Sequence, residues 1–333
     1  MSVIIELKDI KTYFYVSRGF FKTVPVKAVD GVTLKINKGE TIAVVGESGS
    51  GKTTLGRTSL KLIEPVSGRI IFEGRDITDL KGELKWFRKK AQIIFQDPFM
   101  SLNPYMNIKQ IIEEPMIIHG YDEKEREERI IKALSDVRLL PSEEFLPKYP
   151  HMLSGGQRQR VGIAKTLVLD PVFLVADEPV SMIDASSRAE ILYLLREAQK
   201  KYSMGIMYIT HDIATAKYFS DNMAVMYLGK IVEYGETRKI IEEPLHPYTN
   251  ALMEAVPDPD PQNRFKYRKV IPGEPPSPIN PPSGCRFHPR CPYATEKCRK
   301  EEPLLNDIHG HKVACHYAEK IMNSVLSSKN SRE

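Results

Sequence analysis

Cysteine is scarce and late in this sequence: there are four in 333 residues, and none precedes Cys285. A fold held together by disulfides along its length is therefore excluded. Long apolar runs are also missing, because no stretch approaches the roughly 20 residues that cross a bilayer. No charged and then apolar leader opens the chain. We therefore expect a soluble, cytoplasmic protein.

An excess of charge of one sign is lacking as well. The 48 basic and 43 acidic residues are interspersed and leave a formal net charge of +5, which by itself indicates neither a nucleic-acid nor a membrane partner. Apolar residues make up 41% of the chain, which is ample for a core. At this length more than one folded unit is expected.

The most informative segment is rich in glycine and has the pattern Gly-x-x-x-x-Gly-Lys-Thr. It follows an apolar, β-branched run at 41–45 and precedes a helical pattern at 52–63, the context that a phosphate-binding loop requires. The loop and its first helical residues are Gly46, Glu47, Ser48, Gly49, Ser50, Gly51, Lys52, Thr53 and Thr54.

Each residue type in this loop has a physical role. The glycines let successive N–H groups surround an anion. Lys52 is placed to reach the β and γ oxygens of ATP, Thr53 offers a hydroxyl to Mg²⁺, and the following helix N-terminus favours negative charge. The sequence therefore predicts binding of ATP and Mg²⁺.

A second apolar run, 172–176, ends in the acids Asp177 and Glu178. Its pattern is typical of a strand buried on both faces. Asp177 is the natural partner of Mg²⁺, and Glu178, one residue further on, can polarise an attacking water. We therefore predict ATP hydrolysis rather than binding alone.

The chain resembles the nucleotide-binding subunits of ABC transporters in the segment Leu153, Ser154, Gly155, Gly156 and Gln157, which matches that family's signature motif. The segment is also a glycine-rich helix start suited to an anion. The resemblance implies a head-to-tail dimer in which each ATP lies between one chain's phosphate loop and the other chain's signature motif.

The same resemblance implies roles for further residues. Gln96 corresponds to the glutamine that touches Mg²⁺ and the attacking water, His211 to the switch histidine at the γ-phosphate, and Asp184 to the D-loop aspartate. An aromatic residue stacks on adenine in the family. Phe14 is the first choice here and Tyr13 its rival.

The expected fold class is α/β: a P-loop NTPase (ABC ATPase) core with an antiparallel β subdomain, a helical subdomain and a Pro-rich C-terminal metal-binding extension. We place the nucleotide-binding domain at 1–245, with the helical subdomain at about 97–160, and the extension at 246–333. The densest prolines, at 257–282, predict an extended segment. Strands are expected at 32–36, 69–73, 91–95, 205–210 and 223–228, and helices around 108–112, at 123–139 and at 188–201.

Three segments narrow the resemblance to the oligopeptide and dipeptide importers. They are Gln96–Pro104, His246–Thr249 and Pro281–Cys285. The resemblance implies a second ABC ATPase subunit, with a heterodimer expected and a homodimer open. It also implies two transmembrane permease subunits, a substrate-binding protein outside the membrane, and a place at the membrane's cytoplasmic face. An oligosaccharide importer and a soluble ABC ATPase without transport are the alternatives. We expect no nucleic-acid partner, because the chain has neither a second cassette nor a long coiled coil.

The four cysteines are Cys285, Cys291, Cys298 and Cys315. Clustering in a reducing compartment favours metal binding over disulfides. The spacings of five, six and sixteen residues lack the close pairs of a zinc ribbon. By resemblance to the importer branch we expect a [4Fe-4S] cluster. Zinc, with His288 or His316 as substitute ligands, and free thiols remain alternatives.

Overall fold

A computed structural model describes residues 2–18, 22–82, 84–255, 273–308 and 310–321. The chain forms two compact units. The first comprises residues 1–5, 35–40 and 71–208, and the second comprises 6–34, 41–70 and 209–333. Most of the Pro-rich stretch, residues 257–272, lies outside the described residues. Among those described, no helix has the length and apolar character that crossing a bilayer requires.

A sheet with a parallel pair at its centre forms the core of the second unit. Strand β3 (Thr41–Val45) is buried along its whole length and pairs in parallel with β9 (Asn222–Tyr227). Burial on both faces explains the unbroken apolar, β-branched run that marks β3 in the sequence. Strand β10 (Lys230–Glu236) then pairs antiparallel with β9, and β12 (His311–Val313) and β11 (Asn306–Ile308) continue the sheet.

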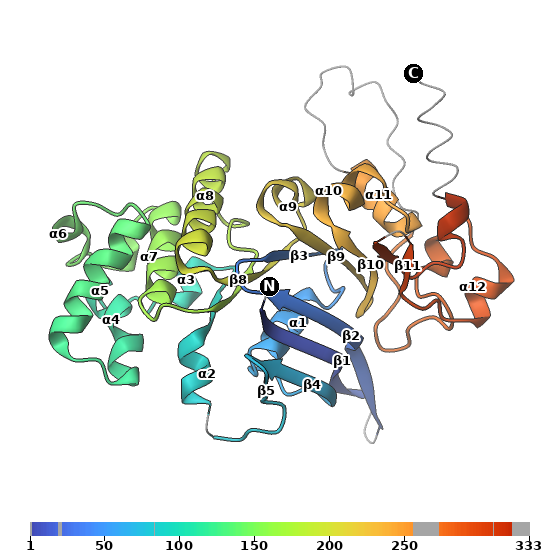
Figure 1. The fold of residues 1–333 in the computed structure, drawn as a ribbon, viewed down its shortest axis with the longest axis horizontal. Coiled ribbons are helices and arrows are strands. Elements are labelled where there is room, and N and C mark those ends of the chain that lie inside the picture. Colours follow the sequence, from blue (N-terminus) through green and yellow to red (C-terminus); the bar gives the residue numbers. More distant parts are fainter. Residues whose placement is uncertain (1, 19–21, 83, 256–272, 309, 322–333) are drawn as a thin grey trace, which may run out of the picture. The chain divides into compact units, whose positions relative to one another are not determined.

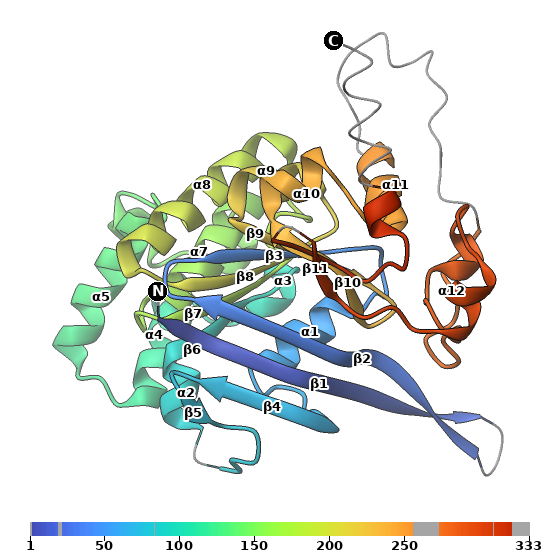
Figure 2. The same ribbon diagram turned by 45° about the vertical axis from the view of Figure 1, so that its right-hand side comes forward.

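The C-terminal residues therefore add strands to the same sheet as the phosphate loop's strand. Figures 1 and 2 show α11 (Pro247–Ala255) beside β10 and β11 in both views. A buried polar contact supports this junction, because His311 Nε2 lies 2.6 Å from Glu233 Oε1 with both side chains out of solvent. Glu233 also accepts hydrogen bonds from the N–H groups of Leu245 and His246. The division of the chain at residue 245 stays a prediction.

A separate sheet has the strand order β2-β1-β4-β5. Its longer strands are β1 (Val3–Arg18) and β2 (Lys22–Asn37), followed by β4 (Ser67–Phe72) and the short β5 (Arg75–Asp76). Strands β4 and β5 are antiparallel, with Ile71 opposite Asp76. The strands predicted at 32–36 and 69–73 belong to this sheet.

In the first unit, β6 (Ala91–Ile94) and β7 (Phe173–Asp177) form a parallel pair, and β8 (Gly205–Thr210) lies next to β7. In the helical part of this unit, α4 (Ile108–His119) and α5 (Glu123–Asp136) pack against α7 (Gly155–Leu167) (Figure 1). Further helices of this unit are α2 (Lys85–Lys90), α3 (Pro98–Ser101), α6 (Ser142–Phe145), η1 (Pro150–Met152) and α8 (Ala185–Tyr202).

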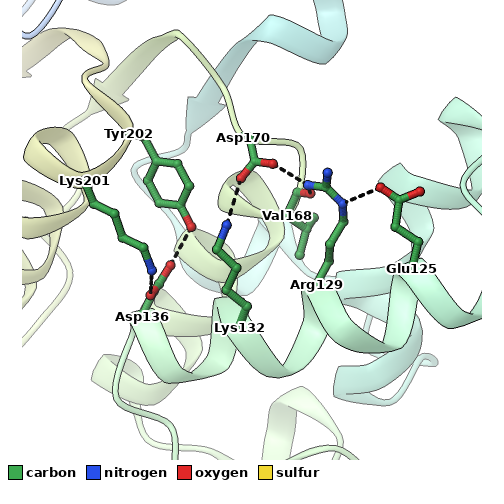
Figure 3. A network of polar contacts seen from close by, with 8 residues as sticks. All are labelled: Glu125, Arg129, Lys132, Asp136, Val168, Asp170, Lys201 and Tyr202. Atoms are coloured by element: carbon green, nitrogen blue, oxygen red, sulfur yellow. Dashed lines mark hydrogen bonds and ion pairs between the residues drawn. The ribbon is translucent and has the colours of Figure 1, made fainter.

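A row of charges fixes α5 to the ends of two other helices (Figure 3). Arg129 donates to Glu125, to Asp170 and, at 3.1 Å, to the carbonyl of Val168 just after α7. One and two turns further on, Lys132 pairs with Asp170, and Asp136 accepts from Lys201 and Tyr202 at the end of α8. This network explains why a very charged sequence forms a well-packed helix.

Several helix ends differ from the sequence prediction for one local reason. Helix α1 (Lys52–Ser59) stops before residue 63, and α5 stops at Asp136 rather than 139. Lys61 and Arg138, just beyond these ends, have φ values of 53° and 55°. A left-handed residue ends a right-handed helix, and nothing in the side-chain pattern announces it.

Candidate functional site

The phosphate loop joins β3 to α1 in the second unit. Lys52 is buried, and its Nζ donates to the loop's own carbonyls, at 2.8 Å from Gly46 O and 2.9 Å from Glu47 O. Gly51, with φ 103°, precedes α1, and no side chain caps this helix end. The first N–H groups of α1 thus have no capping side chain, which is the arrangement that binds phosphate at a helix start.

Two of the loop's glycines are required by close backbone contacts. A Cβ on Gly46 would lie 2.2 Å from the carbonyl oxygen of Met226, and one on Gly51 would lie 2.0 Å from that of Ala28. Gly49 differs, since nothing lies within 4 Å of its Cβ position. The loop is therefore packed against β9 and β2 at its two ends and open in its middle.

Glu47 connects the loop to the C-terminal residues. Its N–H donates to the hydroxyl of Tyr248 at 2.8 Å, and its carboxylate accepts two hydrogen bonds from Arg290, of 2.8 and 3.1 Å. Neither Tyr248 nor Arg290 was expected from the sequence to contact the loop. The only sequence signal is an arginine next to a cysteine, which is too common to be interpreted.

In the first unit, the structure brings together two of the predicted catalytic residues. Gln96, just after β6, donates through Nε2 to Oε2 of Glu178 at 2.9 Å. Asp177 is the last residue of β7 and is buried. Glu178 follows with φ 46°, an unfavourable conformation for a residue other than glycine, and such strain often accompanies functional sites.

The signature motif begins α7. The Ser154 hydroxyl accepts from the N–H of Gln157 at 3.2 Å, and the Gln157 side chain accepts from the N–H of Ser154 at 3.0 Å. This reciprocal pair is a capping box. Gly155 is open, whereas a Cβ on Gly156 would lie 3.2 Å from the Ser187 hydroxyl of α8. The predicted glycine-rich helix start is therefore present.

Asp184 begins α8 and is held by it. Its carboxylate accepts from the Ser186 hydroxyl at 2.5 Å and from the Ser187 N–H at 3.0 Å. These two hydrogen bonds lower the pKa of the Asp184 carboxyl. The Asp184 carboxylate is therefore held in place at the start of α8 and is ionised.

His211 and the aromatic candidates lie in the second unit. His211 is exposed and directly precedes Asp212, which begins α9 (Ile213–Phe219) by accepting from Ala214 N–H at 2.9 Å. The Tyr13 hydroxyl donates to Asp30 at 2.5 Å. The neighbouring Phe14 is 41% exposed. Which of the two rings stacks on adenine stays a prediction.

All four cysteines line one small pocket in the second unit, together with His288 and His316. No three His, Cys, Asp or Glu side chains in the described ranges are arranged to hold a single metal ion. An iron–sulfur cluster requires a different arrangement, because each thiolate binds a different iron atom of the cluster. Four partly or fully buried thiols around one pocket suit that arrangement. A ring nitrogen of each histidine lies 3.0 Å from a backbone carbonyl.

The predicted site residues thus fall into two groups. The phosphate loop, His211, the aromatic candidates and the cysteines belong to the second unit, while Gln96, the signature motif, Asp177, Glu178 and Asp184 belong to the first. The phosphate loop and the signature motif each lie at the start of a helix, as their patterns predict. Their roles stay predictions.

Two family models match the chain. The model described as "ABC transporter" matches residues 29–181, which include the phosphate loop, the signature motif and the two acids after β7. The model for the oligopeptide/dipeptide transporter C-terminal region matches residues 232–298. With the sheet around β3, the first match defines the class: an ATP-hydrolysing cassette of the ABC type.

Relatives and solved structures agree with this class. The oligopeptide transport ATP-binding protein AppF of Bacillus subtilis is 45% identical over 94% of this chain and 97% of its own length. The dipeptide transport ATP-binding protein DppF of Haemophilus influenzae is 46% identical over 92% and 94%. The chain therefore belongs to the family of ABC-transporter ATP-binding proteins for oligopeptides and dipeptides.

Among solved structures, the ATP-binding cassette MJ0796, a dimer in a post-hydrolysis state bound to ADP and Pi, is 27% identical. Its TM-score is 0.62, over 71% of this chain and 99% of that one. CbiO1 of Clostridium perfringens, part of the transporter complex cbiONQ, is 29% identical with a TM-score of 0.63, over 73% and 92%. The predicted ABC ATPase fold is confirmed.

Proposed function

We propose that this chain is the ATP-hydrolysing subunit that powers import of oligopeptides or dipeptides across the cytoplasmic membrane. One observation supports this most: similarity to the peptide-transport relatives runs over more than nine-tenths of the chain. It includes the C-terminal region as well as the nucleotide motifs. The specific branch therefore rests on more than the general ATPase motifs.

The contacts within each unit support a division of labour in hydrolysis. Lys52 donates to the carbonyls of Gly46 and Glu47 in the structure and exchanges them for the β and γ oxygens of ATP. Glu178 accepts a proton from the attacking water while Gln96 holds its carboxylate. Thr53, Gln96 and Asp177 would hold Mg²⁺, which would neutralise charge on the phosphates.

Assembly follows the family. Two ATPase chains, in a heterodimer with a related second chain, bind two permease subunits at the cytoplasmic face of the membrane, and a substrate-binding protein delivers the peptide from outside. The dimeric state of the MJ0796 relative and the open space around the Cβ position of Gly155 at the start of α7 support a shared ATP site. The His211 and Asp184 roles belong to this same proposal.

The cysteines would hold a [4Fe-4S] cluster with a structural role in the C-terminal region. The gathering of the four thiols around one pocket supports this cluster, because thiolates are the ligands that iron–sulfur clusters take. Purification under anaerobic conditions, a visible spectrum and an iron assay test the cluster. Colourless protein without iron would refute the cluster assignment. One equivalent of zinc would instead favour a zinc site with His288 or His316 as a ligand.

Transport is tested with the complete complex in membrane vesicles. We expect uptake of peptides in the presence of ATP, and a Lys52→Ala variant should lose both nucleotide affinity and uptake, because no other group in the loop replaces the ammonium charge. Lys200→Ala, an exposed lysine on α8, is the matched control and should transport normally. ATP hydrolysis stimulated by a binding protein loaded with oligosaccharide, and not with peptide, would refute the peptide assignment.

A further inference from the structure

Two arginines beside the first two cysteines contact the phosphate loop and its neighbouring turn. Arg286 follows Cys285, Arg290 precedes Cys291, and both arginines are buried. We call residues 285–291 the cysteine segment. It contains the short helix η3 (His288–Arg290), and all of its contacts described below lie within the second unit.

Arg290 holds one side of the loop. Its guanidinium donates two hydrogen bonds to the two carboxylate oxygens of Glu47. This fork geometry is among the stronger and more directional ion pairs in proteins. The Arg290 side chain is only 6% exposed, so water competes little for these bonds. The pair therefore fixes the Glu47 side chain in one position.

Aromatic packing supports the same contact from behind. Phe287 of the cysteine segment packs against the rings of Tyr227 and Tyr248, at centroid distances of 5.3 and 5.4 Å. The Tyr248 hydroxyl in turn accepts a hydrogen bond from the N–H of Glu47. Both the main chain and the side chain of Glu47 are thus held by residues of the C-terminal region, while the Glu47 carbonyl accepts from Lys52.

Arg286 holds the other side of the loop through a turn. It donates to the carbonyl of Leu228 and to Asp30. Leu228 lies in the turn between β9 and β10, and the next residue, Gly229, donates its N–H to the carbonyl of Ser50 at 2.8 Å. The cysteine segment therefore reaches the loop at Glu47 directly and at Ser50 through one intervening turn.

We propose that Arg290 is a positioning residue for ATP: by holding Glu47 it keeps the phosphate loop in its binding conformation and links nucleotide affinity to the folded state of the cysteine segment. The inference rests on the proposed function only in taking ATP as the ligand. Arg290 binds Glu47, whose carbonyl in turn accepts from Lys52, so it acts through these two residues.

Two physical effects of losing Arg290 act in the same direction. A loop that adopts its binding conformation only part of the time has an apparent affinity reduced by that fraction. In addition, Glu47, which is only 25% exposed, would keep a carboxylate without its cation next to a loop that must accept negatively charged phosphates. Both effects lower ATP affinity without changing the group that activates water.

The test measures the dissociation constant of ATP for the full-length chain. Arg290→Gln is expected to weaken binding about tenfold, as for a lost charge-assisted hydrogen bond. Glu47→Gln should weaken it too, and the double variant should bind no more weakly than the weaker single variant, because both substitutions break one contact. Arg299→Gln is the control: Arg299 follows Cys298 but is exposed, and its loss should change affinity less than about twofold.

A kinetic and a structural measurement separate positioning from general destabilisation. For Arg290→Gln, we expect KM for ATP to rise while kcat at saturating ATP stays near that of the unmodified chain. Because coupling is reciprocal, bound ADP should slow hydrogen exchange at the N–H groups of Arg290 and Cys291, and Glu47→Gln should abolish that protection. The protection assay uses Glu47→Gln, whose cysteine segment is unaltered.

Three results would overturn the proposal. The first is an ATP affinity of Arg290→Gln within twofold of that of the unmodified chain, and the second is a double variant whose loss of ATP affinity is the product of the two single losses. The third is protection from hydrogen exchange by ADP that persists in Glu47→Gln. Lys52→Ala distinguishes this failure from failure of the proposed function. If Lys52→Ala no longer binds ATP and Arg290→Gln binds it normally, only the proposed link to the cysteine segment is wrong.

Discussion

At the scale of single residues, Glu47 has all four of its polar groups engaged. Its N–H donates to Tyr248, its two carboxylate oxygens accept from Arg290, and its carbonyl accepts from Lys52. The three contacts with Tyr248 and Arg290 remain when Lys52 turns to the phosphates, so the phosphate loop is preorganised on this side. Preorganisation lowers the entropy that binding must overcome.

His246 is a second residue whose state is set by its surroundings. It is fully buried, and burial lowers the pKa of its imidazole to about 4, although the negative charge of Glu233 acts in the opposite direction. Its Nδ1 accepts a hydrogen bond from the N–H of Tyr248 at 3.0 Å. The ring is therefore neutral and carries its proton on Nε2.

This burial predicts a pH dependence of stability. The pKa of His246 is about 4 in the folded chain and about 6.5 when unfolded, so the unfolded chain binds more protons between these values. The free energy of unfolding should then fall as the pH falls from 6.5 to 4, by about 3 kcal/mol.

The measurement is denaturant unfolding at several pH values. His246→Gln keeps a hydrogen-bond acceptor but cannot titrate, so its stability should fall less over this range than that of the unmodified chain. Equal pH dependence in the two proteins would show that His246 is already protonated in the fold or that its burial has no such effect.

At the scale of elements, the phosphate loop depends on backbone contacts that a motif does not describe. Gly51 has φ 103°, and a Cβ there would meet the carbonyl of Ala28 on β2. We expect Gly51→Ala to destabilise the chain by more than about 3 kcal/mol, since backbone strain and a clash both contribute. Nucleotide binding should be lost as well, because the loop cannot then close around the phosphates.

A matched control separates these two contributions. Gly74, in the turn between β4 and β5, has φ 79° and open space around its Cβ position, so Gly74→Ala should cost only the strain, about 1 kcal/mol. Thermal unfolding and ATP titration of both variants give the comparison. Similar losses of stability in the two variants would mean that β2 can move away from the new Cβ at position 51 without a cost in free energy.

The positions of strands were easier to predict from side-chain patterns than the ends of helices. The strands expected at 41–45, 91–95, 205–210 and 223–228 are β3, β6, β8 and β9 to within one residue. For β3, which is buried along its whole length, the reason is that a strand covered on both faces needs an unbroken apolar run. The helix ends were less predictable. Residues such as Lys61 and Arg138 adopt left-handed conformations for reasons of packing that a polar side chain does not reveal.

At the scale of the whole molecule, the family's shared ATP site predicts a measurable association. Glu178→Gln should bind ATP but hydrolyse it very slowly, because an amide cannot accept the proton from water. The closed pair of chains should then accumulate, and light scattering should show the mass double when ATP is added. ADP in place of ATP should not have this effect.

Lys52→Ala is the control for association, since a chain that cannot hold ATP should remain single. If this chain pairs only with a related second chain, the doubling will need that partner to be present. A single chain that fully encloses and hydrolyses ATP would contradict the shared site.

The sequence by itself determined the chemistry of this protein, because the phosphate loop, the signature motif and the acids after β7 are local patterns whose residues act within a few positions of one another. Tertiary structure alone decided which distant residues meet. Arg290 reaches Glu47 across 243 residues of chain, and Gln96 reaches Glu178 across 82. Such pairs depend on the path of the backbone between them, and that path is fixed by the packing of the whole core rather than by the residues that finally touch.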